Sequence, residues 1–228
     1  MARAPTASAP PSPRSDAARS GSADRPMGWH FYRPEDGHGL PHDPFKAIVT
    51  PRPIGWISTV DAEGRPNLAP YSFFNALSSR PPILGFASEG RKDTLANIEA
   101  TGEFVFNLAT GPLAAAVSLT SRTVAADVDE MALAGLAAVP CRIVRAPRVA
   151  ASPAALECRL IEVHRITDLS GQPTDHRLVI GQVVGVHIAQ DYLRDGLFDT
   201  AAAAPLARCG YVADYAVADR ILSVPRED

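Results

Sequence analysis

The sequence predicts a mainly β protein, built as an antiparallel barrel with a few short helices. Short apolar and β-branched segments alternate with turn residues, as in Ile54–Thr59 followed by Asp61–Gly64. Two longer strand-like segments, Ala155–Thr167 and Leu178–Ile188, flank Gly171–Pro173 and predict an antiparallel pair. Because strands come first, short helices are inserted, and strands follow again, a doubly wound parallel sheet is disfavoured.

The first half of the chain supplies the shorter predicted strands. Ile54–Thr59 and Pro66–Ala69 are separated by the turn residues Asp61–Gly64, which predicts a hairpin. Pro81-Pro82 then interrupts the chain before a further strand at Ile83–Ala87.

A helix and another strand follow. Asp93 is a plausible N-cap for a helix that runs to about Ala100, and Gly102 is a C-cap signal. Phe104–Leu108 reads as the next strand, and the alanine- and leucine-rich residues 112–137 predict helix in pieces.

Composition limits the classes of protein that this chain can be. Of 228 residues, 46% are hydrophobic and 21% are charged, which is typical of a soluble globular domain. The net charge of −3 gives no global attraction to nucleic acid or to an anionic membrane. No apolar run approaches the roughly 18 residues of a membrane span. Three dispersed cysteines without a CxxC pair indicate a reducing compartment, so we expect a cytoplasmic protein without disulfides or zinc.

Residues 1–27 differ from the rest of the chain. They contain no aromatic residue and are rich in Pro, Ser and Ala, so they cannot bury enough apolar area to offset the entropy of ordering. We predict a disordered N-terminal extension over 1–27, either an idle tail or the result of translation starting at Met27, and a folded domain over 28–228.

Several common kinds of catalytic site are missing from the sequence. It contains no GxGxxG after a strand, no GxSxG, no P-loop and no HExxH. His38, His42 and Asp43 lie together in a Pro/Gly loop, where we interpret them as solvated. His164 and His187 fall in strand-like segments and are interpreted as structural. We therefore expect neither a metal site nor an ordinary hydrolase.

Two segments carry residues that suit a flat aromatic ligand. In Thr50–Thr59, Trp56 offers a large planar surface beside Gly55, but for this segment taken alone a core tryptophan on a barrel strand is the better explanation. In Asn67–Asn75, aromatic, hydroxyl and amide side chains follow a proline that ends a strand, and they could lie along a heterocycle. The alternative is a packed loop that plugs one end of a barrel.

A third segment, Glu89–Thr94, suits an anion. Arg91 and Lys92 stand at a predicted helix start, where backbone N–H groups and the helix dipole attract phosphate. The alternative is a helix capped by Asp93 with solvated basic neighbours. The order of an aromatic and amide segment, a strand and an anion site fits flavin mononucleotide (FMN).

These motifs also resemble a known family. The segments PRPIGWISTVDAEGRPNLAPYSFFNALSSRPPILGF, RKDTLANIEATGEFVFNL, VIGQVVGVHI and PLARCGYVADYA resemble the flavin reductase-like family with the FMN-binding split-barrel fold, over about residues 28–216. The resemblance is greatest to the branch that contains reductase components of two-component monooxygenases and flavoredoxins. It implies a six-stranded antiparallel Greek-key barrel that forms a homodimer, with each FMN near the dimer interface.

The resemblance also implies roles for individual residues. Asn107 would support the pocket or touch the ligand, or else hold neighbouring strands together. The implied cofactor-binding residues are Trp56 and Ser58 flanking the flavin, Ser72, Phe73 and Asn75 along the isoalloxazine and ribityl chain, and Arg91, Lys92 and Thr94 at the phosphate.

The implied activity is that of an NAD(P)H:flavin reductase, with NADH or NADPH as donor and a monooxygenase or another redox protein as acceptor. The flavin carries the chemistry, so no catalytic side chain is expected, although Arg52 is a candidate cation near the N1/O2 edge. Where the family has Arg-Leu-Gly-Gly, this chain has Arg208-Cys209-Gly210-Tyr211, which puts a close backbone approach at Tyr211 in doubt. An FMN electron-transfer protein without a nicotinamide site is therefore the alternative, and a barrel that has lost flavin is a third.

Overall fold

The computed structural model describes residues 28–125 and 127–225. The chain divides into two compact units between Gly39 and Leu40. In the described part of the first unit, the short 3₁₀ helix η1 (Pro34–Asp36) carries ion pairs from Arg33 to Glu35 and Asp36. The disorder predicted for residues 1–27 lies outside the described residues, and the domain start at residue 28 stays a prediction.

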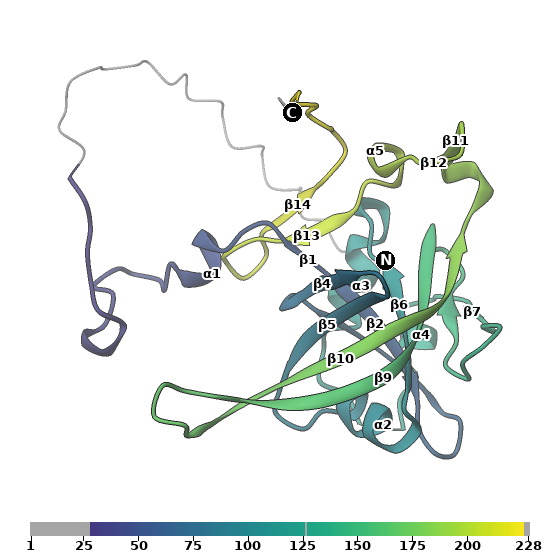
Figure 1. The fold of residues 1–228 in the computed structure, drawn as a ribbon, viewed down its shortest axis with the longest axis horizontal. Helices are drawn as coiled ribbons and strands as arrows, with labels where there is room; N and C mark the ends of the chain where they lie inside the picture. The colour runs from purple at the N-terminus through teal and green to yellow at the C-terminus, as the bar shows by residue number, and fades with distance from the viewer. Residues whose placement is uncertain (1–27, 126, 226–228) are drawn as a thin grey trace, which may run out of the picture. The chain divides into compact units, whose positions relative to one another are not determined.

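A seven-stranded antiparallel sheet forms the body of the second unit, in the order β3-β2-β6-β9-β10-β5-β4 (Figure 1). Only Ser72 and Phe73 separate β3 from β4, and these two strands stand at opposite edges of the sheet. They act as one bent strand that closes the sheet into a barrel. Counted in this way, the barrel has the six strands that were predicted. The strands are β2 (Gly55–Val60), β3 (Pro66–Tyr71), β4 (Phe74–Ser79), β5 (Pro82–Glu89), β6 (Glu103–Leu108), β9 (Ala154–Thr167) and β10 (Pro173–Ile188).

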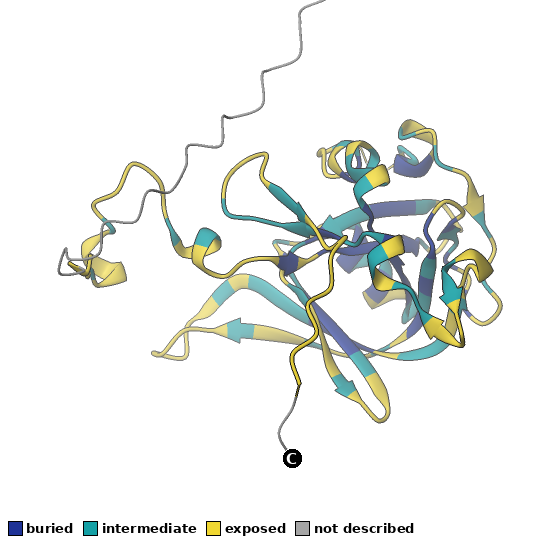
Figure 2. Cartoon of the chain, turned by 90° about the horizontal axis from the view of Figure 1, so that it is seen from above, coloured by how far each residue is buried: buried dark blue, intermediate teal, exposed yellow. Residues whose placement is uncertain are grey.

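The strand order is not sequential, as expected for a Greek-key connection. The chain leaves β5, passes through α2 (Asp93–Thr101) and enters β6 on the other side of the β9–β10 hairpin. Figure 1 shows this hairpin as two long crossing strands whose tip extends away from the barrel. The outer half of the hairpin is largely exposed, whereas the half at the barrel is buried in part (Figure 2).

Strand β2 is buried on both of its faces, which explains its nearly continuous apolar sequence. Ile57 points into the barrel interior, a cluster that also contains Phe86 and Phe104. Its neighbour Trp56 points the other way, into a second cluster beneath the helices that cover the barrel wall. Met131 of α4 (Glu130–Leu133) belongs to this second cluster.

The helix predicted from Asp93 to about Ala100 is present as α2. Its N-cap residue is Lys92 rather than Asp93, which becomes the first helical residue, and it ends at Gly102, whose φ of 71° is left-handed. Leu95 and Ile98 of α2 pack into the barrel interior. The helical pieces predicted over 112–137 are present as η2 (Gly111–Leu113), α3 (Ala114–Leu119) and α4.

Smaller elements surround the barrel. The strands β1 (Arg52–Pro53), β13 (Leu206–Arg208) and β14 (Tyr215–Val217) form a three-stranded sheet, and α1 (Phe45–Ile48) precedes it in the chain. The others are β7 (Ala138–Val139), β8 (Arg148–Val149), η3 (Gln190–Tyr192), β11 (Leu193–Arg194), β12 (Leu197–Phe198) and α5 (Thr200–Ala203). Among the helices of the described residues, none has the length and hydropathy that crossing a membrane requires.

Two sequence-based expectations about strands need correction. The segment after Pro70 continues as strand to Tyr71 and again over β4, because Pro70 lies on an edge strand where its missing N–H costs little. The strand expected from Leu178 begins earlier, at Pro173, because pairing with β9 extends along the projecting hairpin.

Candidate functional site

The predicted ligand-binding residues are distributed between two cavities and the barrel wall. One cavity, here called the basic pocket, has a volume of about 380 Å³ and contains Arg91, Lys92 and Thr94. The other, here called the aromatic pocket, has a volume of about 620 Å³ and contains Ser72, Phe73 and Asn75. Trp56 and Ser58 lie in neither cavity, because both are fully buried.

Three cationic side chains line the basic pocket. Arg91 forms an ion pair with Glu99 on α2, at 3.2 Å between Nη2 and Oε2. Lys92 and Arg122 line the same pocket, and among the described residues neither takes part in an ion pair that would neutralise it. Hydroxyl groups of Ser121 and Thr123 accompany them. This combination suits a phosphate or another compact anion.

A hydrogen-bonded group of polar side chains forms the base of the basic pocket. The amide of Asn67 donates to the hydroxyl of Thr94 at 2.8 Å and to that of Thr59 at 3.3 Å, which ties β3 to the start of α2. Burial raises the pKa of the Tyr71 phenol, against the opposing influence of the nearby Thr94 and Ser88 hydroxyls. The Tyr71 oxygen is buried close to these two hydroxyls and has no hydrogen bond of good geometry within the described residues.

Two carboxylates, those of Glu130 and Asp93, also line the basic pocket. Among the described residues, neither forms an ion pair with Lys92 or Arg122. Glu130 is buried and accepts a hydrogen bond from the backbone N–H of Leu68 at 3.1 Å. Burial raises the pKa of Glu130, which favours its neutral form relative to an exposed glutamate. Asp93 occupies the first turn of α2, where a carboxylate stabilises the helix.

The aromatic pocket lies at the bend between β3 and β4. Phe73 is 36% exposed, with its ring 6.0 Å from that of His176 and 5.9 Å from the ammonium of Lys46. Asn75 is exposed, and its side-chain oxygen accepts a hydrogen bond from the N–H of Ala76, which leaves its NH₂ group free to donate. The pocket therefore presents one open aromatic face with an amide beside it.

The opposite wall of the aromatic pocket is built around Arg52. Its guanidinium is buried and donates to the backbone carbonyls of Lys46, Val49 and Cys209. Burial lowers the pKa of Arg52, with a further contribution from the charge of Arg208. These three hydrogen bonds join α1 to the segment after β13. Arg52, the candidate cation near the N1/O2 edge of the flavin, therefore also holds these two segments together.

The segment that departs from the family pattern packs against α1. A Cβ at Gly210 would overlap the Cα and Cβ of Ala47, so the close backbone approach occurs at Gly210. Tyr211 is 45% exposed and its ring lies 5.9 Å from that of His42. Arg208 donates to the carbonyls of Tyr211, Val212 and Asp214, and this holds the loop in place.

The remaining predicted residues reinforce the barrel wall. Trp56 donates from its indole N–H to the hydroxyl of Thr120 at 2.9 Å. Asn107 donates to the carbonyl of Trp56 and to the hydroxyl of Ser58, both at 3.1 Å, and accepts from the N–H of Val149 at 2.7 Å. Of the roles considered for Asn107, the one that the structure shows is the linking of neighbouring strands. Trp56 acts on the basic pocket through Thr120, which lines it.

The linings of the two pockets include consecutive residues of the chain. Pro70 and Tyr71 line the basic pocket, and the next residues, Ser72 and Phe73, line the aromatic pocket. Since an extended strand rises about 3.3 Å per residue, this stretch of β3 and the bend spans roughly 10 Å.

Sequence reasoning missed part of the basic pocket. Arg122 and its neighbours Ser121 and Thr123 come from the loop after α3, some thirty positions beyond Lys92 in the sequence. The run Ser-Arg-Thr directly after an alanine-rich helix was a visible signal, but nothing in the sequence indicated that it meets the start of α2.

The family model described as flavin reductase like domain matches residues 48–206. The chain belongs to the flavin reductase-like family. The matched range contains most of both pockets, including every residue that was predicted to bind the cofactor. The family expected from the motifs is thus confirmed.

Individual relatives agree with this assignment. A protein of Deinococcus radiodurans is 38% identical over 176 residues, which cover 72% of this chain and 74% of the relative. The structure of nitrilotriacetate monooxygenase component B from Bacillus cereus has a TM-score of 0.75 at 25% identity, covering 90% of this chain and all of that one. The 2-nitrobenzoate 2-nitroreductase NbaA of Pseudomonas fluorescens has a TM-score of 0.68 at 29% identity, covering 79% and 88%. Flavoredoxin of Desulfovibrio vulgaris shares the fold, with a TM-score of 0.67 at 24% identity over 76% and 90%.

Proposed function

We propose that this flavin reductase-like protein binds FMN across the basic and aromatic pockets and acts as an NAD(P)H:flavin reductase. The observation that carries the proposal is that consecutive residues of β3 and the bend that follows it line the two pockets. Unneutralised cations and hydroxyls at one end suit a phosphate, and an exposed aromatic ring with a free amide at the other suits a flavin ring.

Lys92, Arg122 and Arg91 would hold the phosphate, with Thr123 as a neutral donor. Thr94 is buried and already accepts from Asn67, so its main contribution would be to keep the start of α2 in position, with its hydroxyl proton free to donate. The phenol of Tyr71, which makes no hydrogen bond of good geometry within the described residues, would donate to the ligand.

Phe73 and Asn75 would hold the flavin ring, by stacking and by hydrogen bonding respectively, with Ser72 beside them at the bend. Trp56 and Ser58 would support the barrel wall behind the cavities without touching the ligand, because both side chains are fully buried. When bound, FMN supplies the hydride acceptor for NADH or NADPH, and the electrons pass on to a monooxygenase or another redox protein. The side chains bind, orient and exclude water, so none is assigned as a catalytic acid or base.

The proposal is tested by purifying the protein, loading it with FMN and following NADH and NADPH oxidation by absorbance. We expect a flavin absorption spectrum and turnover with at least one donor. Lys92→Ala and Arg122→Ala should weaken FMN binding, whereas Arg159→Ala, an exposed change on β9, should not. A protein that binds no FMN would overturn the assignment of both pockets.

An FMN electron-transfer protein of the flavoredoxin type is the second candidate. The observation that favours it is the loop from Cys209 to Asp214, held by Arg208 and packed against α1 beside the aromatic pocket. If this loop leaves no room for nicotinamide, photoreduced FMN would pass electrons to an acceptor protein without NADH or NADPH oxidation. Turnover with either nucleotide would exclude this candidate.

We further propose a cytoplasmic homodimer. Leu77 is 51% exposed on the rim of the aromatic pocket, where a second copy of the chain would cover it. Light scattering of the FMN-loaded protein tests the dimer. A monomer at micromolar concentration would contradict it.

A further inference from the structure

A third cavity lies between the segment around Cys141–Glu157 and the end of β10. Its volume is about 600 Å³, which is within the range of sites for small organic molecules. It shares no lining residue with the basic or the aromatic pocket, so it is separate from the proposed FMN site. We call it the outer pocket, and it is lined by Arg142, Ile143, Arg148, Ala150, Ser152, Pro153, Ala154, Ala155, Glu157, Gly185, Val186, His187, Ile188 and Ala189.

A buried carboxylate organises the outer pocket. Glu157 has 1% of its side chain exposed, and it accepts backbone N–H bonds from Arg142, Ile143 and Val144 at 2.6–3.0 Å. His187 Nε2 bonds to the same carboxylate at 2.6 Å. Burial opposes ionisation of Glu157, but these hydrogen bonds outweigh it and lower the pKa to about 2. The carboxylate therefore fixes both the loop that carries Arg142 and the imidazole of His187.

The sheet is deformed to accommodate this carboxylate. Pairing between β9 and β10 is irregular between Val183 and Gly185. A Cβ at Gly185 would lie 3.1 Å from Glu157 Oε1 and 3.2 Å from the side chain of Ile143, so a larger residue would crowd both. A glycine at the bulge thus lets a charged group sit inside the wall of the pocket.

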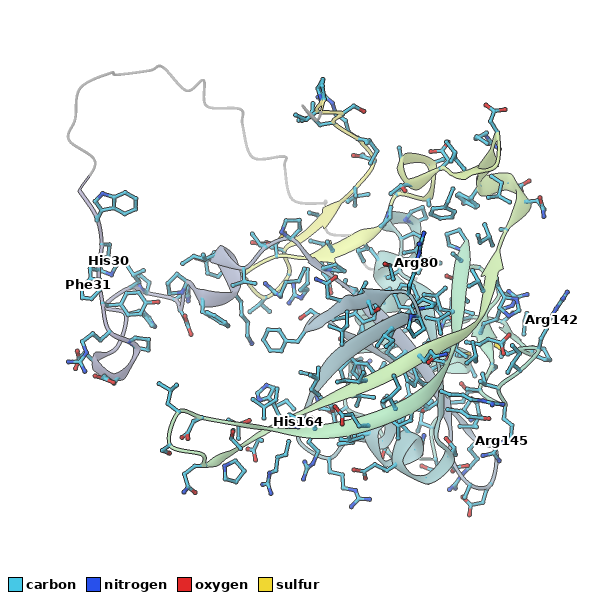
Figure 3. The ribbon with its side chains drawn as sticks, in the orientation of Figure 1. His30, Phe31, Arg80, Arg142, Arg145 and His164 are labelled. Carbon is cyan, nitrogen blue, oxygen red and sulfur yellow. The ribbon has the colours of Figure 1, made fainter. Side chains whose placement is uncertain are left out.

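Among the described residues, two arginines of the outer pocket have no carboxylate partner. Arg148 has a buried Nε that makes no hydrogen bond within the described residues. Neither Arg148 nor Arg142 takes part in an ion pair with any side chain that the structure describes. Figure 3 shows Arg142 extending outward from the segment between β7 and β8, as does Arg145. Because Arg142 is exposed and also lines the pocket, it lies at the mouth of the pocket. A buried guanidinium donor beside a cavity is costly unless an acceptor occupies it.

A metal ion is the competing occupant, since ligand atoms of Cys141, Glu157 and His187 lie within 4.8 Å of one another. Two observations disfavour it. The oxygens of Glu157 already accept four hydrogen bonds. Arg142 and Arg148 also add positive charge beside the three groups.

We propose that the outer pocket binds a small organic carboxylate. The carboxylate group would accept from Arg148 inside the pocket and from Arg142 at its mouth, with His187 held in place beside it by Glu157. The apolar part of the molecule would pack against Pro153, Val186 and the neighbouring alanines. This site would operate alongside the flavin site and does not depend on it.

Benzoate is a suitable probe, because it combines one carboxylate with an apolar ring. We expect saturable binding of one benzoate per chain to FMN-loaded protein in a calorimetric titration, without a change in the flavin absorption bands. Arg148→Met and Arg142→Met should each weaken binding by about tenfold or more, the scale of a charge-assisted hydrogen bond. Arg159→Met, an exposed change on β9, should leave the affinity for benzoate unchanged.

Several results would overturn the proposal. One is the absence of saturable benzoate binding. Another is a benzoate affinity in both Arg148→Met and Arg142→Met that equals the affinity of the unchanged protein. A third is a benzoate-dependent shift of the flavin absorption bands, which would place the probe at the flavin. Stoichiometric zinc binding that Cys141→Ser abolishes would assign the pocket to a metal. If Arg148→Met does not fold, Arg142→Met and Arg148→Lys give the same comparison. The titration is repeated without FMN, so failure of the proposed flavin site does not remove the test.

Discussion

The indole N–H of Trp56 lies 2.9 Å from the hydroxyl of Thr120, and this hydrogen bond joins the protein core to the basic pocket. Trp56 is fully buried in the cluster beneath α3 and α4, and Thr120 begins the loop that carries Arg122. The position of one of the three cations thus depends on a core tryptophan.

Replacing Thr120 with Val tests this link. The change leaves the indole N–H buried without a partner, and we expect the free energy of unfolding to fall by about 1–3 kcal/mol. FMN affinity should fall as well, because the loop of Arg122 loses its anchor. Thr120→Ser keeps the hydroxyl and should restore most of both quantities. Denaturant unfolding measures the stability, and FMN fluorescence titration measures the affinity. If Thr120→Val and Thr120→Ser have the same stability and the same FMN affinity, the hydrogen bond contributes to neither.

The basic pocket predicts a graded loss of FMN affinity. Lys92→Ala and Arg122→Ala should each weaken binding by about 1.5–3 kcal/mol, as expected for loss of a hydrogen bond to a charged group. Arg91→Ala should have a smaller effect, because Arg91 is shared with Glu99. The fluorescence titration is compared at low and high salt, since exposed cations are screened. If Arg91→Ala has the largest effect of the three, the phosphate lies elsewhere in the pocket.

The contact between Gly210 and Ala47 predicts that the loop cannot accept a larger residue. Gly210→Ala would force Ala47 and α1 to move, and overpacking of this kind costs about 1–3 kcal/mol of unfolding free energy. Ile48 and Val49 line the aromatic pocket, so its shape should change as well. Gly28→Ala is the matched control, because a Cβ there meets no atom within 4 Å. Thermal and denaturant unfolding should therefore show a lower stability for Gly210→Ala and an unchanged stability for Gly28→Ala.

The low pKa of Glu157 predicts a pH-dependent contribution to stability. The group is ionised in the folded protein down to about pH 2, whereas in the unfolded chain it titrates near its ordinary value of 4.5. Its contribution is therefore fully present above about pH 4.5 and is lost as the pH falls toward 2, with a magnitude of roughly 3 kcal/mol.

Glu157→Gln should remove this contribution. The variant should be less stable than the unchanged protein at pH 7, and the difference should shrink as the pH is lowered from 5 toward 3. Denaturant unfolding at several pH values measures it, with the exposed change Glu162→Gln on β9 as control. A difference that does not depend on pH would show that the carboxylate is not ionised as described.

Much of the barrel could be predicted from sequence because its strands carry local signals. The turn at Asp61–Gly64 and the breaks at Pro81-Pro82 and Gly102 separate the elements, and the β-branched runs between them form strands. The β4 strand could not be predicted in this way. It pairs with the next strand, β5, across the turn at Arg80 and Pro81, but its sequence does not alternate clearly. The bend at Ser72–Phe73, which separates it from β3, is set by barrel closure, and this is a long-range property.

The site was predictable where its residues are close in sequence, and not elsewhere. Arg91 and Lys92 share one pocket because they are adjacent in the chain, whereas Arg122 reaches it only through the packing of α3 on the barrel wall. The residues of Thr50–Thr59 favour a core role for Trp56, and only the resemblance makes Trp56 and Ser58 ligand contacts. Both are fully buried, because β2 is covered on both of its faces. The hydrogen bond between Glu157 and His187 depends on the register and the bulge of two strands, so no local sequence pattern predicts it.

The tip of the β9–β10 hairpin has a consequence for the order in which the chain folds. Asp168 accepts hydrogen bonds from the backbone of Ser170 and Gln172 and from the hydroxyl of Ser170, so the turn is closed entirely by its own residues. Closing so short a loop costs little chain entropy. We expect this hairpin to form before the distant ends of the bent strand meet their partners, and the slow step of folding to be closure of the barrel at Ser72–Phe73.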